Sequence, residues 1–147
     1  MVISSPLKNE NHVTGMRVLF ICTGNAHRSP LAEALLKKMR PDLNVDSAGL
    51  HVVIPISDEA KEYLKEEGAE QYLKKHPESL TEKKLDTYDL IVAMQQRHKD
   101  AVVQTCPACE AKTIVWNIED PYNMPYQDAE KIYAQIKEKV TELAKTL

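Results

Sequence analysis

The segment between Cys22 and Ser29, CTGNAHRS, combines residues that can carry out phosphate chemistry. An apolar run precedes it and a helical pattern follows it, so we predict a loop between a buried strand and a helix. In this loop, the guanidinium group of Arg28 can bind two phosphate oxygens at once. The positive field would also hold Cys22 as the thiolate, which is the nucleophilic form of cysteine. Ser29 could cap the helix and also donate its hydroxyl proton toward that sulfur.

The backbone of the same loop can form a cradle for a phosphate group, because its N–H groups lie next to a helix N-terminus. Gly24 permits close approach of the backbone, and Asn25 tolerates the left-handed conformation that such loops often require. Taken alone, Cys22 could be a small buried hydrophobe and Arg28 a solvated charge, but their spacing across this junction favours a functional role. We predict Cys22 and Arg28 as catalytic residues and a phosphate-binding set of Thr23, Gly24, Asn25, Ala26, His27 and Ser29.

A second candidate lies in the segment Asp120-Pro121-Tyr122, after the last predicted strand. Attack of a thiolate on a phosphate monoester expels an alkoxide or phenolate, which needs a proton. Asp120 could supply that proton and then accept one from the water that hydrolyses the phosphocysteine. Tyr122 could stack beside an aromatic leaving group. Asp-Pro is also a common turn signal, so only the first loop makes the catalytic interpretation of Asp120 the favoured one.

Strands and helices alternate along the chain. Short apolar runs predict strands at 18–21, 44–48, 90–94 and 113–116, and periodic patterns predict helices beginning at Ser29, Ser57 and Arg97, with a last one over 129–147. Thr81 is expected to cap a further short helix. No hairpin signal separates the strands, so we predict one doubly wound α/β domain whose parallel sheet has helices on both faces. Ligands of such sheets bind at the carboxyl ends of the strands, where both loops lie.

Composition excludes several classes of protein. The 147 residues carry 19 Lys and Arg against 22 Asp and Glu, a net charge of −3, so no basic excess indicates a nucleic-acid or anionic-membrane partner. Three cysteines are too few for a secreted disulfide scaffold. Cys106 and Cys109 could form a local disulfide, an intermolecular metal site or a turn of small residues, and we favour the turn.

Residues 1–15 are polar and aperiodic, so we predict a loose N-terminal leader followed by a single folded domain over 16–147. The leader lacks the apolar run of a secretory signal, and no later segment approaches the length of a membrane span. We therefore expect a cytoplasmic protein without a membrane partner. We also expect neither a metal nor a cofactor, because Arg28 and the loop dipoles can supply the charge stabilisation.

The segment FICTGNAHRSP resembles the signature of the low-molecular-weight protein tyrosine phosphatase family, Cys-x-Gly-Asn-x-Cys-Arg-Ser-Pro. The resemblance covers the chain from Met16 onward and includes Ala32-Glu33-Ala34, Ser47-Ala48-Gly49 and Asp120-Pro121-Tyr122. It implies a flavodoxin-like fold with strand order 2-1-3-4. It also implies hydrolysis of a phosphorylated protein through a phosphocysteine intermediate, with inorganic phosphate as product.

The sequence departs from the family pattern at several positions. His27 replaces a second cysteine that can protect the nucleophile as a disulfide; it could strengthen the positive field when protonated or merely tolerate the loop. Ala26 matches neither tyrosine-specific relatives nor arginine phosphatases, so a protein arginine phosphatase remains the alternative. The aliphatic residues of 50–56 could line the substrate entrance, contact a partner or add to the core, and we favour core packing. Glu78 and His76 receive no role, although relatives often have a supporting arginine and histidine near there.

Two further functions are less favoured. Arsenate reductases share the fold and the first loop, but they use two additional cysteines just past the third strand, and Cys106 and Cys109 are not at that place. A non-catalytic phosphate-binding module would have no need for an acid such as Asp120.

Overall fold

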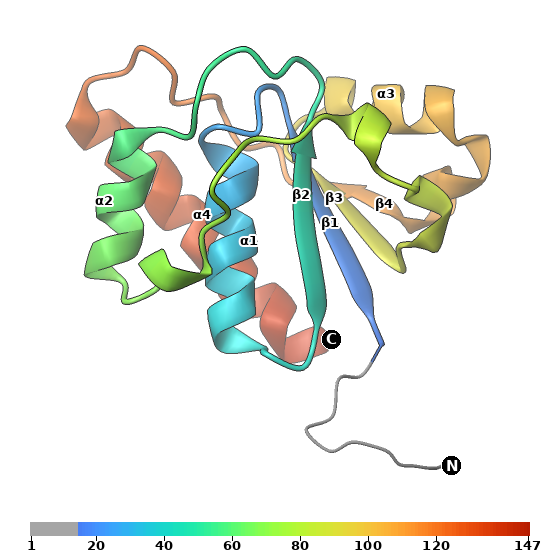
Figure 1. The fold of residues 1–147 in the computed structure, drawn as a ribbon, viewed down its shortest axis with the longest axis horizontal. Helices are drawn as coiled ribbons and strands as arrows, with labels where there is room; N and C mark the ends of the chain where they lie inside the picture. The colour runs from blue at the N-terminus through green and yellow to red at the C-terminus, as the bar shows by residue number, and fades with distance from the viewer. Residues whose placement is uncertain (1–14) are drawn as a thin grey trace.

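The first strand, β1 (Arg17–Cys22), is buried from Val18 to its end. Successive side chains of a strand point to opposite faces of its sheet, so a strand without exposed residues must be covered on both sides. Figure 1 shows this arrangement in the computed structural model, which describes residues 15–147. Helices lie on both faces of a single sheet, as the sequence predicts.

The sheet is parallel and has the order β2-β1-β3-β4, which confirms the predicted fold class and strand order. The other strands are β2 (Asn44–Gly49), β3 (Leu90–Ala93) and β4 (Thr113–Val115). The α-helices are α1 (Arg28–Met39), α2 (Asp58–Glu66), α3 (Gln96–Thr105) and α4 (Tyr126–Thr146).

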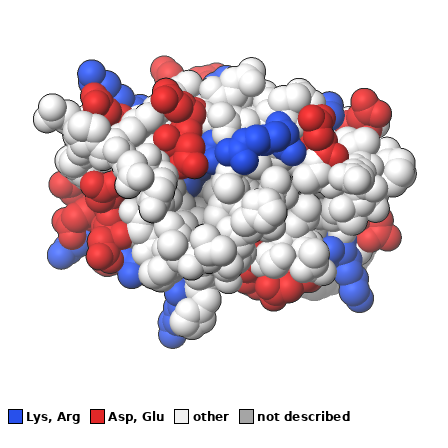
Figure 2. Space-filling view, turned by 90° about the horizontal axis from the view of Figure 1, so that it is seen from above, with Lys and Arg blue, Asp and Glu red and all other residues white. Residues whose placement is uncertain are grey.

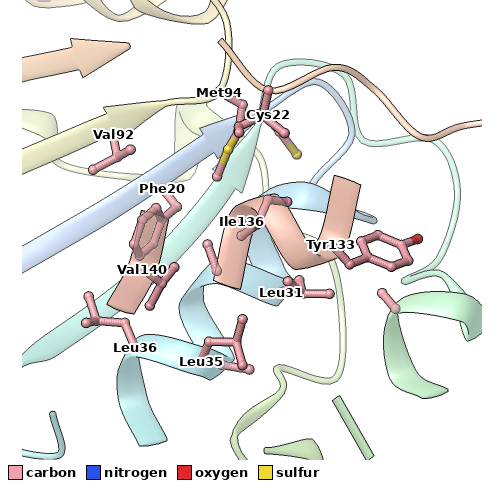
Figure 3. Packing of buried hydrophobic residues seen from close by; sticks show 14 of the residues in the cluster. Phe20, Cys22, Leu31, Leu35, Leu36, Val92, Met94, Tyr133, Ile136 and Val140 are labelled. Carbon is pink, nitrogen blue, oxygen red and sulfur yellow. The ribbon is translucent and has the colours of Figure 1, made fainter. Parts of the chain in front are cut away.

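Each face of the sheet has its own hydrophobic core. Val18 and Phe20 pack with residues of α1 and α4 on one face, where Figure 3 shows Cys22 at the end of the same strand. Leu19 and Ile21 pack with Val102 of α3 on the other face. Because side chains of β1 pack in both cores, the position of Cys22 at the start of the following loop is well defined.

Local structure differs from expectation at two helix starts. The first helix begins at Arg28, with His27 as its N-cap residue and no side-chain cap, so the predicted capping role of Ser29 is wrong. Ser79, not Thr81, caps a short 3-10 helix at Leu80–Glu82, because its hydroxyl accepts the N–H of Thr81. The expected cap at Ser57 is confirmed: its hydroxyl accepts two N–H groups of α2.

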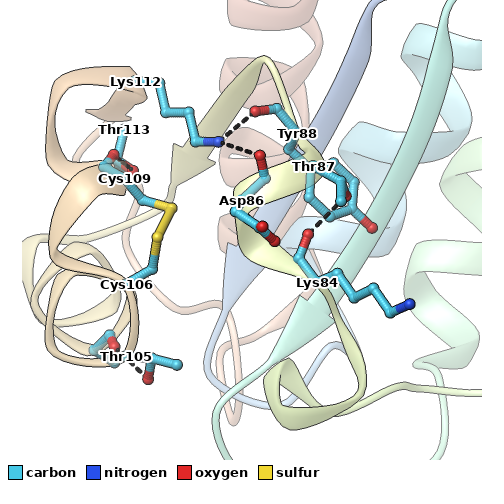
Figure 4. The surroundings of a disulfide bond; sticks show 10 residues. Lys84, Asp86, Thr87, Tyr88, Thr105, Cys106, Cys109, Lys112 and Thr113 are labelled. Carbon is cyan, nitrogen blue, oxygen red and sulfur yellow. Dashed lines mark hydrogen bonds between the residues drawn. A yellow bond between two sulfur atoms is a disulfide. The ribbon is translucent and has the colours of Figure 1, made fainter.

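Cys106 and Cys109 form a disulfide, with their Cα atoms 5.4 Å apart. The preference for a simple turn of small residues is therefore wrong, and the first of the three alternatives is correct. The disulfide lies in the connection between α3 and β4 (Figure 4). In the same connection, the hydroxyl of Thr113 donates a hydrogen bond to the carbonyl of Cys109 at 2.7 Å.

The predicted leader lies outside the described residues except for Gly15, so its boundary stays a prediction. No helix of residues 15–147 is long and apolar enough to cross a membrane. Figure 2 views the molecule from the end at which the strands terminate. Most of the described part of this face carries neither Lys and Arg nor Asp and Glu. A basic group lies near its centre with acidic groups on either side, and the other charged side chains lie toward the rim.

Candidate active site

A pocket of about 250 Å³ lies where the loops after β1, β2 and β4 meet. Most of the site residues predicted from the sequence line it: Cys22, Thr23, Gly24, Ala26, His27, Arg28, Asp120 and Tyr122. The two other predicted residues, Asn25 and Ser29, are fully buried and do not line the pocket. Their side chains shape the loop instead of facing a ligand.

Cys22 ends the central strand, and only 2 % of its surface is exposed. Its Sγ atom lies 2.9 Å from the hydroxyl of Ser29, which is in the first turn of α1. Ser29 therefore contacts the sulfur, as the sequence predicts. Cys22 is also the free cysteine of the chain, because Cys106 and Cys109 pair with each other.

Arg28 lies almost completely buried beside the thiol, with 1 % of its surface exposed. Its Nη1 donates to Oε1 of Gln95 at 2.7 Å and to the carbonyl of Ile118 at 2.8 Å. Its Nη2 lies 3.6 Å from a carboxylate oxygen of Asp120. Burial lowers the pKa of Arg28, whereas Cys22 and Asp120 raise it. An arginine stays cationic under these conditions, so the pocket that contains the thiol and the carboxylate also holds a fixed positive charge.

The hydroxyl oxygen of Thr23 lies within hydrogen-bond distance of three side chains at the pocket edge. Arg97 donates at 2.7 Å and Arg28 at 3.2 Å, while Nε2 of His98 lies 3.0 Å away. Because Nδ1 of His98 accepts the backbone N–H of Gln95, the proton of the neutral ring must lie on Nε2. Burial and the charges of the two arginines lower the pKa of His98 to about 3. The ring therefore stays neutral and keeps this tautomer at physiological pH.

His27 and Tyr122 form one side of the pocket mouth. Their rings meet edge to face, with the centroids 6.1 Å apart, and Tyr122 is 56 % exposed. Burial lowers the pKa of His27 more than the carboxylates of Asp120 and Glu59 raise it. A neutral His27 adds no positive charge near the thiol at pH 7. The structure therefore favours the interpretation that His27 merely tolerates the loop.

Aliphatic residues of the segment after β2 also contribute to the pocket lining. Val53 and Ile54 line the pocket and are 82 % and 37 % exposed, whereas Ile56 is buried. The predicted core packing of this segment is therefore wrong for Val53 and Ile54 and correct for Ile56. His51 also lines the pocket, and its N–H donates to the carbonyl of Thr23 at 2.8 Å.

Comparison with known protein families identifies the family to which this chain belongs. Residues 17–147 match the family described as low molecular weight phosphotyrosine protein phosphatase. The chain belongs to this family.

Several relatives of this phosphatase family are similar over most of their length. Low molecular weight protein-tyrosine-phosphatase Etp of Escherichia coli (strain K12) is 33% identical, covering 88% of this chain and 93% of the relative. A protein-arginine-phosphatase of Geobacillus stearothermophilus is 36% identical, covering 76% and 82%. Among solved structures, Wzb of Vibrio vulnificus in complex with benzylphosphonate is 30% identical and superposes with a TM-score of 0.82, covering 90% of this chain and 99% of its own.

The sequence did not predict the residues that hold the loop after β1 by hydrogen bonds, which are Gln95, His98, Lys74 and Glu78. Gln95 and His98 follow β3, so their position at the carboxyl end of a strand was a usable signal. Lys74 and Glu78 come from an irregular segment and gave no such signal; the N–H of Glu78 donates to Oδ1 of Asn25 at 2.8 Å. Within the described residues, no group of three or more His, Cys, Asp and Glu side chains is arranged to hold a metal ion.

Gly49, rather than Gly24, is the glycine that the phosphatase loop requires. A Cβ atom at Gly49 would lie 2.6 to 2.8 Å from backbone atoms of residues 23–25. We expect Gly49→Ala to destabilise the protein by about 1–3 kcal/mol, because the loop backbone must move. Thermal unfolding would measure this change. Gly24→Ala is the matched control, since its Cβ would meet only the carbonyl of His51 at 3.6 Å and the Cβ of Ala26 at 3.9 Å. Equal melting temperatures for the two variants would contradict the prediction.

Proposed function

We propose that this chain hydrolyses phosphotyrosine in proteins through a phosphocysteine intermediate. The observation that carries the proposal is the convergence of a free thiol, a buried guanidinium group and a carboxyl group on one pocket. These are the nucleophile, the charge stabiliser and the proton donor that hydrolysis of a phosphate monoester needs.

In the proposed first step, Sγ of Cys22 attacks phosphorus and the bond to the phenolic oxygen breaks. Asp120 gives its proton to the leaving oxygen. Arg28 and the loop N–H groups stabilise the charge on the three remaining phosphate oxygens. In the second step, Asp120 takes a proton from water, which attacks the phosphocysteine, releases inorganic phosphate and regenerates the thiolate.

The pocket mouth favours an aromatic leaving group. Val53, Ile54 and Tyr122 offer apolar and aromatic surface on which a phenyl ring can pack. The guanidinium group of a phosphoarginine would need several acceptors for its N–H groups, and Asp120 is the one carboxylate among the residues that line the pocket. Similarity to a protein-arginine-phosphatase keeps that substrate as the second candidate.

A phosphorylated protein is the proposed partner, with no nucleic acid, membrane or cofactor involved. We also propose a cytoplasmic location, which is the expectation from the sequence. An arsenate reductase function is not favoured. Cys106 follows the ten residues of α3, which place the disulfide roughly 15 Å from the pocket end of that helix.

A direct comparison of two phosphopeptides tests the proposal. Peptides of one sequence would carry either phosphotyrosine or phosphoarginine, and released phosphate would be measured with and without EDTA. We expect kcat/KM to be at least about tenfold higher for phosphotyrosine, since about 1.4 kcal/mol of ring packing suffices for that ratio. EDTA should have no effect.

A preference for phosphoarginine would replace the substrate assignment and leave the phosphocysteine chemistry in place. Loss of activity in EDTA that added metal restores would overturn the chemistry itself.

A further inference from the structure

A lysine ammonium group lies beneath the phosphate loop. The side chain of Lys74 is 9 % exposed, and its Nζ atom donates to Oδ1 of Asn25 at 3.0 Å and to the carbonyl of Ser47 at 2.8 Å. Asn25 is fully buried and has a left-handed backbone with φ of 53°. Lys74 thus contacts the residue of the loop whose backbone lies in the left-handed region.

The donors around Asn25 fix the orientation of its amide group. Oδ1 accepts from Lys74 and from the backbone N–H of Glu78, so the NH₂ group must point the other way. There Nδ2 donates to the hydroxyl oxygens of Ser29 at 2.8 Å and Ser47 at 2.9 Å. The flipped amide would direct its NH₂ group at two donors.

The direction of these bonds continues to the sulfur. Because the oxygen of Ser29 accepts from Asn25, its own proton is available for Sγ of Cys22, 2.9 Å away. Each bond in the series runs the same way, from Lys74 through Asn25 and Ser29 to Cys22. A hydroxyl that donates to sulfur favours the thiolate over the thiol.

We propose that Lys74 is a positioning residue that orients the Asn25 amide so that the Ser29 hydroxyl donates to Cys22. This role deepens the proposed phosphatase function and rests on it for its effect on turnover. Its effect on the reactivity of Cys22 does not depend on the identity of the substrate.

The charged groups around this series come from several elements. Lys74 lies 2.7 Å from Glu78, 3.8 Å from Asp46 of β2 and 3.9 Å from Glu33 of α1. Lys37 and Lys83 approach the same carboxylates, and Arg28 and Asp120 are the charged residues that line the pocket with Cys22.

Lys83 provides a matched control. It is 8 % exposed and pairs with Asp46 at 2.7 Å and with Glu78 at 3.1 Å, two of the three carboxylates near Lys74. Within the part of the chain that the structure describes, Lys83 forms no hydrogen bond with Asn25. Lys83→Met therefore removes a buried cation from the same cluster without removing a donor to the loop.

The experiment measures alkylation of Cys22 by iodoacetamide as a function of pH, without reductant, so that Cys106 and Cys109 stay paired. We expect Lys74→Met to slow alkylation at pH 7 about tenfold and to move its pH midpoint upward by about one unit. The kcat for an aryl phosphate should fall by a similar factor, with KM changed less than about threefold. Lys74→Arg should restore most of the alkylation rate, and Lys83→Met should leave it within about twofold of wild type.

Equal effects of Lys74→Met and Lys83→Met on the alkylation profile would overturn the proposal, as would a wild-type profile in Lys74→Met. If Lys74→Met does not fold, the double variant Lys74→Met with Glu78→Gln removes a carboxylate together with the cation. It should show the same loss relative to Glu78→Gln alone. Failure of the phosphatase proposal would appear as absent turnover in the wild type, while the alkylation result would stand by itself.

Discussion

Replacement of Cys22 by serine is expected to reduce hydrolysis of aryl phosphates and phosphotyrosine peptides by about 10⁴-fold or more. A serine hydroxyl is almost fully protonated at neutral pH, and Ser29, its nearest neighbour, is no base that could deprotonate it. Arg28 and the loop N–H groups would still bind phosphate, but no nucleophile would attack it. Steady-state assays of released phosphate would measure the loss.

The control for Cys22→Ser is ligand binding. Since Cys22 is small and buried, the variant should fold and still bind inorganic phosphate, which calorimetry can measure. Turnover near the wild-type level would assign the nucleophile to another group and end the phosphocysteine mechanism.

Asp120→Asn is expected to show the second-largest effect, and the effect should depend on the leaving group. For a phosphotyrosine peptide, whose phenolate is a poor leaving group, kcat should fall by about 10²–10⁴-fold, because no proton is delivered as the bond breaks. For p-nitrophenyl phosphate the loss should be smaller, since nitrophenolate leaves without a proton. The ratio of the two kcat values is the measurement that isolates general-acid catalysis.

Glu119→Gln is the matched control for Asp120→Asn. Glu119 precedes Asp120 and is exposed, and it does not line the pocket. The Glu119→Gln variant should therefore leave both kcat values within about twofold of wild type. Equal losses for the two substrates in Asp120→Asn, or a comparable loss in Glu119→Gln, would contradict the assignment of Asp120 as the acid.

The chemistry-bearing residues were predictable because their signals are contiguous in the chain. The strand before Cys22, the loop and the helix after Arg28 occur within a single segment, and each has its own local pattern. The position of Asp120 in the pocket was predictable by a second step, because a parallel sheet brings the ends of its strands to the same edge. Ala26 and Tyr122 line the pocket as expected, since each neighbours one of these residues.

The sequence by itself therefore determined the sheet, its α/β class and most of the residues that line the pocket, because apolar periodicity and short motifs depend on neighbouring residues. Tertiary structure alone decided how those groups are held. Lys74 is 49 residues from Asn25 in the chain, and Gln95 is 67 residues from Arg28, yet both pairs form hydrogen bonds. A lysine or glutamine in a polar segment has the composition of an ordinary surface residue until the fold buries it against a partner. The Cys106–Cys109 bond was left open for a related reason, since a Cys-x-x-Cys spacing fits a turn as well as a disulfide until the backbone sets the distance between the two residues.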